Sequence, residues 1–253
     1  MKIAVCIKQV PTREWQPRIR DDKTWIREDD VAYEMNEPDA YALEESLRLR
    51  EKHGGEVVVC SAGPARVQQV LREALARGAD RALHVEDPSL ASADAFIIAG
   101  ALAAAMAEEQ FDLVLTGLQS DDQGHAQTGV VLAERLGIPH STIIMEVQVQ
   151  DARLRVKREL EGGWFQWIAM PMPALLTIQS GINQLRYATL KGIMAAKKKE
   201  IRKVSRPAGL QASQEISALA VPSKAKQTQM LTGSAPEAAR ELVRRLRDEA
   251  RVL

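Results

Sequence analysis

The chain has 253 residues, of which 45% are hydrophobic and 27% are charged, and its 34 Lys and Arg residues balance its 34 Asp and Glu residues. This composition excludes disordered, collagen-like and disulfide-stapled proteins and predicts a soluble globular one. The zero net charge also removes any general attraction to nucleic acid or to an anionic membrane.

The compartment is indicated by the cysteines and by the first residues. Cys6 and Cys60 show neither a metal-binding nor a C-x-x-C spacing, which favours a reducing environment. The N-terminal residues lack the apolar segment and the cleavage site of a secretory signal. The most apolar stretch, 95–107, is too short to span a bilayer. We therefore expect a cytoplasmic protein without membrane insertion.

The first half of the chain alternates short apolar runs with longer amphipathic runs, which predicts a parallel sheet covered by helices on both faces. Asn36 is the expected N-cap of the first helix, and Gly54 is its expected end. The predicted strands cover 3–10, 57–61, 82–85 and 113–116, and the predicted helices cover about 37–53, 65–77, 93–109 and 127–136.

The pattern changes after Pro139. Alternating apolar and polar residues over 143–149, 154–160 and 164–168 predict an antiparallel hairpin addition, and the apolar run 174–179 predicts a strand that returns to the main sheet. From Arg186 the chain is first basic and then rich in Ser, Ala, Gln and Pro, which predicts an extended arm. The arm is expected to end in an amphipathic helix over about 235–250.

Several kinds of chemistry have no support in the sequence. The four histidines are scattered, so no metal site is expected. A nucleophile elbow is missing, and the glycines of 124–129 are not followed by the Lys and Ser or Thr of a phosphate loop. We therefore expect no catalytic residues for covalent hydrolysis or for nucleoside triphosphate hydrolysis.

The segment 117–129 is the strongest candidate for a binding site, because it leaves a buried strand through a polar loop and then enters a helix. The backbone N–H groups of Ala126, Gln127 and Thr128, and the Thr128 hydroxyl, would favour a phosphate at the helix N-terminus. Asp121 and Asp122 would suit ribose hydroxyls or ring amines. An ordinary strand-to-helix loop with capping residues would show the same pattern. Two further strand ends, 6–9 and 61–64, converge on the same place, which favours a bound and unreacted nucleotide.

Six segments together resemble the β subunit of electron transfer flavoproteins over residues 1 to about 205. They are 2–11, 35–45, 61–64, 74–81, 117–129 and 186–199. The resemblance implies a heterodimer with an α subunit that holds the redox-active FAD, and a buried AMP in the β subunit. The implied AMP positions are Cys6, Asn36, Ala62, Asp122, Ala126, Gln127 and Thr128.

The resemblance also implies a docking segment for partner dehydrogenases. Leu190 matches the leucine that anchors on those partners, and Tyr187, Ile193 and Met194 surround it. An exposed leucine that enters an apolar pocket contributes roughly 1.5–3 kcal/mol. We accordingly expect an α/β nucleotide-binding domain over 1–185, a recognition loop and basic segment over 186–205, and a partner-wrapping arm with a helix over 206–253.

The implied function is that of an electron carrier rather than an enzyme. Such a carrier takes electrons from acyl-CoA or related dehydrogenases, as in fatty acid oxidation, and passes them to a quinone-linked oxidoreductase. An alternative is an electron-bifurcating flavoprotein that oxidises NADH at a second FAD in place of AMP. Ala126 and Gln127 agree with that version, whereas Thr128 agrees with the AMP version. A stand-alone adenine-nucleotide sensor of the universal stress type is a third reading, and the arm beyond Arg186 argues against it.

Overall fold

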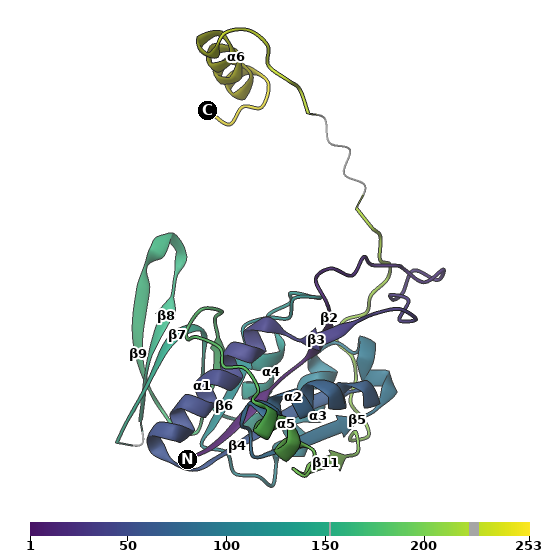
Figure 1. The fold of residues 1–253 in the computed structure, drawn as a ribbon, viewed down its shortest axis with the longest axis vertical. Coiled ribbons are helices and arrows are strands. Elements are labelled where there is room, and N and C mark those ends of the chain that lie inside the picture. Colours follow the sequence, from purple (N-terminus) through teal and green to yellow (C-terminus); the bar gives the residue numbers. More distant parts are fainter. Residues whose placement is uncertain (152, 223–227) are drawn as a thin grey trace. The chain divides into compact units, whose positions relative to one another are not determined.

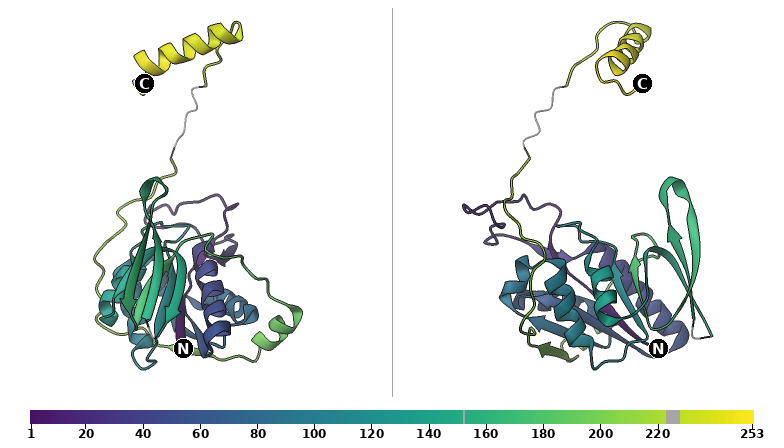
Figure 2. Two further views of the ribbon diagram at one scale, coloured as in Figure 1. Left: turned by 90° about the vertical axis from the view of Figure 1, so that its left-hand side faces the viewer. Right: turned by 180° about the vertical axis from the view of Figure 1, so that it is seen from behind.

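The computed structural model describes residues 1–151, 153–222 and 228–253. They form two units, Met1–Leu219 and Ala220–Leu253. The first unit contains every described strand, and Figures 1 and 2 show its sheet with helices on both faces.

Nine strands of the described residues form the main sheet, in the order β11-β5-β4-β1-β6-β10-β7-β8-β9. They are β1 (Lys2–Cys6), β4 (Glu56–Gly63), β5 (Arg81–Glu86), β6 (Leu113–Gly117), β7 (His140–Gln150), β8 (Arg153–Glu159), β9 (Phe165–Pro171), β10 (Ala174–Ile178) and β11 (Ile201–Val204). Only the pairings of β8 with β7 and β9 are antiparallel within this sheet. The predicted α/β fold with a mostly parallel sheet is confirmed.

Helices cover both faces of the sheet because successive side chains of each strand point to opposite sides. From β1, Ile3 and Val5 pack with the core on the side of α1 and α2, whereas Ala4 and Cys6 pack with the core on the side of α3 and α4. The four helices are α1 (Glu37–His53), α2 (Gln68–Arg77), α3 (Ala95–Met106) and α4 (Thr128–Leu136). Burial on both faces explains the uninterrupted apolar runs of the strands.

The first predicted strand was too long. β1 ends at Cys6, and the chain then forms β2 (Gln9–Pro11), which pairs with β3 (Tyr33–Met35) in a separate antiparallel sheet. At the break the Lys8 N–H donates to the Asp39 carboxylate of α1 at 2.7 Å, and the Lys8 carbonyl accepts from the Asn36 N–H at 3.0 Å, next to the β2–β3 pairing.

Two helix boundaries also differ from the predictions. The segment predicted as a helix from residue 65 begins with a 3-10 turn (Ala65–Val67), and α2 starts only at Gln68. α3 is shorter than expected, because the Asp94 carboxylate caps it by accepting from the Ile97 N–H at 2.9 Å, and it ends at Met106.

The hairpin addition is confirmed. β7 pairs with β10 near its start and with β8 further along, so that β8 and β9 extend the sheet as a long hairpin (Figure 1). The Lys157 ammonium lies over the Phe165 ring at 4.1 Å, and the Arg155 guanidinium lies over the Trp167 ring at 4.2 Å. β10 lies between β6 and β7, as expected for a strand that returns to the main sheet.

The expectation of an extended chain from Arg186 onward was wrong for 190–204. This segment forms a short helix, α5 (Leu190–Ala196), and the edge strand β11. The helix α5 packs on α2. Arg72 of α2 donates to the carbonyls of Ala196 and Lys199 at 2.6 Å each. In return, the Lys199 ammonium donates to two carbonyls at the end of α2, those of Leu75 and Ala79.

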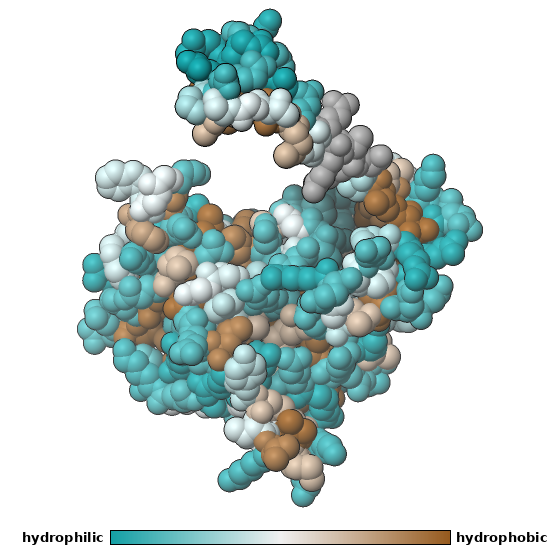
Figure 3. Space-filling model, turned by 45° about the horizontal axis from the view of Figure 1, so that its top comes forward, coloured by the Kyte–Doolittle hydropathy of each residue, from teal (hydrophilic) through white to brown (hydrophobic). Residues whose placement is uncertain are grey.

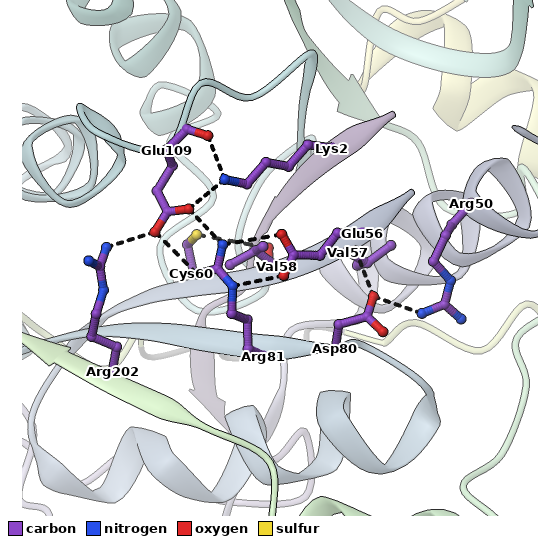
Figure 4. A network of polar contacts seen from close by, with 10 residues as sticks. All are labelled: Lys2, Arg50, Glu56, Val57, Val58, Cys60, Asp80, Arg81, Glu109 and Arg202. Carbon is purple, nitrogen blue, oxygen red and sulfur yellow. Dashed lines mark hydrogen bonds and ion pairs between the residues drawn. The ribbon is translucent and has the colours of Figure 1, made fainter. Parts of the chain in front are cut away.

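Arg202, one of the basic residues that follow Arg186, bonds to a buried carboxylate and so helps to hold β11 in the sheet. Glu109, at 8% exposure, accepts from Lys2 at 2.7 Å, from Arg81 at 2.6 Å and from Arg202 of β11 at 2.8 Å (Figure 4). The hydrogen bond from Arg81 is the main cause that holds the pKa of Glu109 down to about 2. Glu109 therefore fastens the edge strand to the beginnings of β1 and β5.

The arm beyond β11 stays on the first unit as far as Leu219. The N–H groups of Ser213 and Gln214 donate to Asp94 at 2.6 and 2.9 Å, and Leu210 packs on the core beside α3. Asp94 therefore has two roles, because one oxygen caps α3 and the other holds the arm.

The second unit contains the predicted terminal helix, α6 (Ala235–Asp248), which begins with a capping box between Ser234 and Glu237. The helix is amphipathic, and Leu242 and Val243 on it are exposed. Figure 3 shows hydrophobic side chains gathered along one side of this unit and hydrophilic ones over the rest. No helix in the described residues combines the length and apolar character that a membrane span requires.

Candidate functional site

The carboxyl ends of β4, β1 and β6 lie side by side, which confirms the predicted convergence of these strand ends. Cys6 is in register with Cys60 on one neighbouring strand and with Thr116 on the other. The loops that leave these strands therefore start from one edge of the sheet, which is where open α/β sheets bind ligands. We call this edge, with the loop 117–129, the strand-end site.

Asn36 holds the loop of the strand-end site. Its side-chain amide donates to the Gln119 carbonyl at 2.9 Å, and its side-chain oxygen accepts from the Asp121 N–H at 2.9 Å. Asn36 stands at the N-cap of α1, as predicted, but its side chain makes no capping bond to that helix. Because both ends of the side chain are engaged and it is 1% exposed, Asn36 orients the loop.

Asp122 lies at the rim of the strand-end site and faces a cation. Its carboxylate accepts from the Lys8 ammonium at 2.7 Å, and the same ammonium also donates to Gln123 at 2.9 Å. Beside it, Arg13 pairs with Glu37 and lies 3.5 Å from Asp121. The acidic residues of the loop are thus compensated by Lys8 and Arg13, which keeps the loop from repelling an anion.

The start of α4 presents backbone donors. Ala126 has a φ of 54°, in the left-handed region, and Gln127 follows with a φ of −102°. Such a sequence of conformations turns successive N–H groups toward one point, which is the geometry of an anion-binding nest. Within the described residues, the N–H groups of Ala126, Gln127 and Thr128 make no hydrogen bond.

A second observation at this place is the Gln127 side chain. Its Oε1 atom is buried and has no hydrogen-bond partner among the described residues. A buried polar atom without a partner costs roughly 1–3 kcal/mol, and a bound group that donates to it would remove that cost. The donors of the helix start and this acceptor together fit a ligand that carries both an anion and a hydrogen-bond donor.

Cys6 and Ala62 contribute apolar surface. Cys6 is 7% exposed, and burial raises the pKa of its thiol well above the ordinary value, so the thiol stays neutral. Ala62 is half-buried near the end of β4 and packs on the same core as Cys6. The structure therefore places all seven predicted positions on segments that meet at the strand-end site, although Asn36 and Asp122 are already paired within the protein.

Sequence reasoning missed Asp39. This residue is 6% exposed, and its carboxylate accepts from the N–H groups of Lys8 at 2.7 Å and Gly117 at 2.9 Å. Burial raises its pKa to about 7. The sequence shows only an acidic residue in the first turn of a helix, which is common. Its position five residues before the conspicuous acidic pair Glu44 and Glu45 gives no indication of these contacts.

The four predicted partner-contacting residues lie elsewhere, on α5 and just before it. Their exposed fractions are 91% for Tyr187, 84% for Leu190, 44% for Ile193 and 62% for Met194. Arg186 anchors the base of this segment on α1, with Nε 2.7 Å from a Glu44 oxygen and Nη1 2.5 Å from a Glu51 oxygen. The exposed apolar side chains thus lie on a segment that is fixed at its base.

Comparison with known proteins adds an independent finding. A family model described as "Electron transfer flavoprotein domain" matches residues 23–208. The chain is 42% identical over 209 residues to "Electron transfer flavoprotein subunit beta" of Methylophilus methylotrophus, covering 81% of this chain and 79% of that protein. Proteins of the same name from Thermoanaerobacterium thermosaccharolyticum and Homo sapiens are 39% and 35% identical, with 97% and 100% of this chain covered and 98% and 99% of theirs.

Proposed function

Because the chain belongs to the electron transfer flavoprotein family as a β subunit, we propose that it pairs with an α subunit that holds FAD and that it binds AMP at its own strand-end site. In this proposal the heterodimer carries electrons between other proteins, and the β subunit catalyses no reaction alone. The FAD supplies the redox chemistry. The β subunit contributes a structural nucleotide site and a docking surface.

The nest at Ala126–Thr128 is the observation that carries the nucleotide proposal. Its three backbone N–H groups and the Thr128 hydroxyl would hold the phosphate. The buried Gln127 Oε1 would accept a hydrogen bond from the nucleotide, and Cys6 and Ala62 would contact its apolar surface. Asn36 and Asp122 would act through the loop that they orient.

The exposed side chains of α5 support the docking proposal. Leu190 and its neighbours Tyr187, Ile193 and Met194 offer an apolar surface to acyl-CoA dehydrogenases or related flavin dehydrogenases. Electrons would leave to a quinone-linked oxidoreductase. We propose that 186–205 is the dehydrogenase-docking part and that 206–253, with the amphipathic α6, contacts the α subunit. The two buried free cysteines support a reducing location such as the cytoplasm.

An electron-bifurcating β subunit with a second FAD in place of AMP is the competing proposal. Ala126 and Gln127 agree with the sequence pattern of that version. Thr128 agrees with the AMP-binding members of the family, in which a hydroxyl at this position closes the phosphate site and crowds a longer pyrophosphate. We therefore keep AMP as the leading proposal.

Cofactor content tests these proposals directly. The chain is coexpressed with its α subunit, the purified heterodimer is denatured, and FAD and AMP are quantified by liquid chromatography. One FAD and one AMP per heterodimer are expected. Two FAD and no AMP would favour the bifurcating alternative. AMP bound to a chain that copurifies with no yellow partner would instead favour the adenine-nucleotide sensor.

A further inference from the structure

Asp39 joins two chain segments that the sheet itself leaves separate. The backbone ladder between β1 and β6 ends at the pair Cys6 and Thr116. Just beyond that pair, one Asp39 oxygen accepts from the Lys8 N–H at 2.7 Å and the other from the Gly117 N–H at 2.9 Å. The carboxylate therefore continues the connection between the strands where hydrogen bonds between their backbones have stopped.

Both joined segments border the strand-end site. Gly117 begins the loop that ends in the nest at the start of α4, and the Lys8 side chain holds Asp122 in that loop. The contact with Gly117 is so close that a Cβ atom there would lie 2.3 Å from Asp39 Oδ1. An acidic residue at the third position of a helix commonly bonds to its own helix start, whereas this one reaches across to two strand ends.

We propose that Asp39 is a positioning residue for the nucleotide, and that its ionised carboxylate holds the two sides of the strand-end site in the geometry that retains AMP. The inference rests on the proposed function, because it assumes that AMP occupies this site. Asp39 acts through the backbone of Lys8 and Gly117, and it needs no contact with the ligand.

The proposal makes AMP retention depend on pH. The ionised carboxylate accepts from both N–H groups through charged oxygens, whereas a protonated carboxyl carries a hydrogen on one oxygen and is the weaker acceptor of the two states. The groups that face Asp39 are the Lys8 ammonium on the β1–β2 connection, the neutral Cys6 thiol of β1 and the Asn36 amide before α1. Burial raises the pKa of Asp39 to about 7, against the opposing effect of these hydrogen bonds and of Lys8. The ionised fraction therefore falls from about nine tenths at pH 8 to about one tenth at pH 6.

The test measures AMP binding to the heterodimer by calorimetry at pH 6 and pH 8. Asp39→Asn should weaken AMP binding at pH 8 by about tenfold or more, because the side-chain amide turns a donor toward one of the two N–H groups. The ratio of the variant's Kd to the wild-type Kd should shrink about tenfold on going to pH 6. The phosphate of AMP titrates identically in both measurements, so the ratio removes its contribution.

Asp112→Asn is the matched control. The Asp112 carboxylate accepts from the Lys2 N–H at 2.7 Å, the same kind of bond, but at the opposite ends of β1 and β6. This variant should keep the wild-type Kd and its pH profile. A loss of AMP in Asp112→Asn as large as in Asp39→Asn would mean that general loosening of the sheet explains the effect, and it would overturn the inference.

Other outcomes separate this inference from the proposed function. Wild-type affinity in Asp39→Asn, or a wild-type pH profile in that variant, would overturn the inference and leave AMP binding intact. A wild-type heterodimer that binds no AMP would overturn the proposed function itself. If Asp39→Asn does not assemble, Asp39→Glu replaces it, because the carboxylate is kept. Its AMP affinity should fall toward pH 6 by more than the titration of the AMP phosphate accounts for, and a fall no larger than that in both Asp39→Glu and the wild type would refute the inference.

Discussion

Gly192 of α5 lies so close to α2 that a Cβ atom built on it would sit 2.3 Å from the carbonyl oxygen of Ala76. The obstacle is backbone, which cannot move aside as a flexible side chain can. α5 therefore approaches α2 at a distance that only glycine permits, and this contact sets the position of the exposed residues on α5.

Gly192→Ala should push α5 away from α2. We expect the free energy of unfolding to fall by about 1–3 kcal/mol, as for other overpacked sites, together with slower electron transfer from the dehydrogenase. Urea unfolding and the kcat/KM with a partner dehydrogenase measure the two effects. Lys191→Ala, at the neighbouring exposed position, should change stability by less than about 0.5 kcal/mol. Equal stability of both variants would contradict the close approach.

Leu190→Ala should weaken docking without weakening the fold, because the side chain is 84% exposed. Loss of about 1.5–3 kcal/mol of apolar burial against a partner predicts a roughly ten- to hundredfold lower kcat/KM for the dehydrogenase. The flavin content and the melting temperature should stay at wild-type values. Leu190→Met, which keeps an apolar side chain of similar size, should retain most of the activity. Unchanged kinetics in Leu190→Ala would rule out the assignment of α5 as the docking segment.

Thr128→Val tests the hydroxyl at the start of α4. Loss of one hydrogen bond to the phosphate, about 1 kcal/mol, should lower AMP affinity roughly fivefold. AMP per heterodimer after extended dialysis gives the measurement. Thr128→Ser keeps the hydroxyl and should keep the nucleotide, so equal AMP loss in both variants would point to helix packing instead of phosphate binding.

Glu109→Gln should destabilise the first unit in a pH-dependent way. The pKa of Glu109 is lowered from its ordinary value of 4.5 to about 2, chiefly by the hydrogen bond from Arg81, so the ionised group stabilises the fold above pH 4.5. That contribution is lost as the pH falls toward 2. We expect a loss of about 2–4 kcal/mol at pH 7.

Urea unfolding at pH 7 and at pH 3 measures this dependence, and the difference between Glu109→Gln and the wild type should shrink at the lower pH. The adjacent and exposed Glu108 supplies the control, since Glu108→Gln should match the wild type within about 0.5 kcal/mol. A difference that stays constant from pH 7 to pH 3 would show that the charge of Glu109 is not the cause.

The strands that are buried on both faces and the helices of ordinary length could be predicted from the sequence, because both produce long and regular apolar patterns. α5 and β11 could not be predicted from the sequence. α5 has seven residues and β11 has four, and in β11 the polar residue Arg202 bonds to Glu109 instead of facing solvent as part of a regular pattern. Elements this short have no periodicity that a sequence pattern can reveal.

The residues of the candidate site likewise include some that the sequence could predict and some that it could not. The loop 117–129 could be found because glycines and polar residues follow a buried strand. Asp39 could not, because its importance arises from the two strand ends that the folded chain brings to it. The Asn36 side chain likewise bonds to the loop 117–129 instead of capping its own helix, and only the tertiary structure shows this.

Among the described residues, α5 is fixed by contacts with other parts of the same chain. Arg72 bonds to the carbonyls that follow α5, Lys199 bonds to those that end α2, and Arg186 is paired at the base of the segment. In the proposed docking, a partner would meet a helix that is already ordered, so that little conformational entropy would be lost in binding. The association rate should then be set by diffusion and by the orientation of the two surfaces, with no folding step of α5 to slow it.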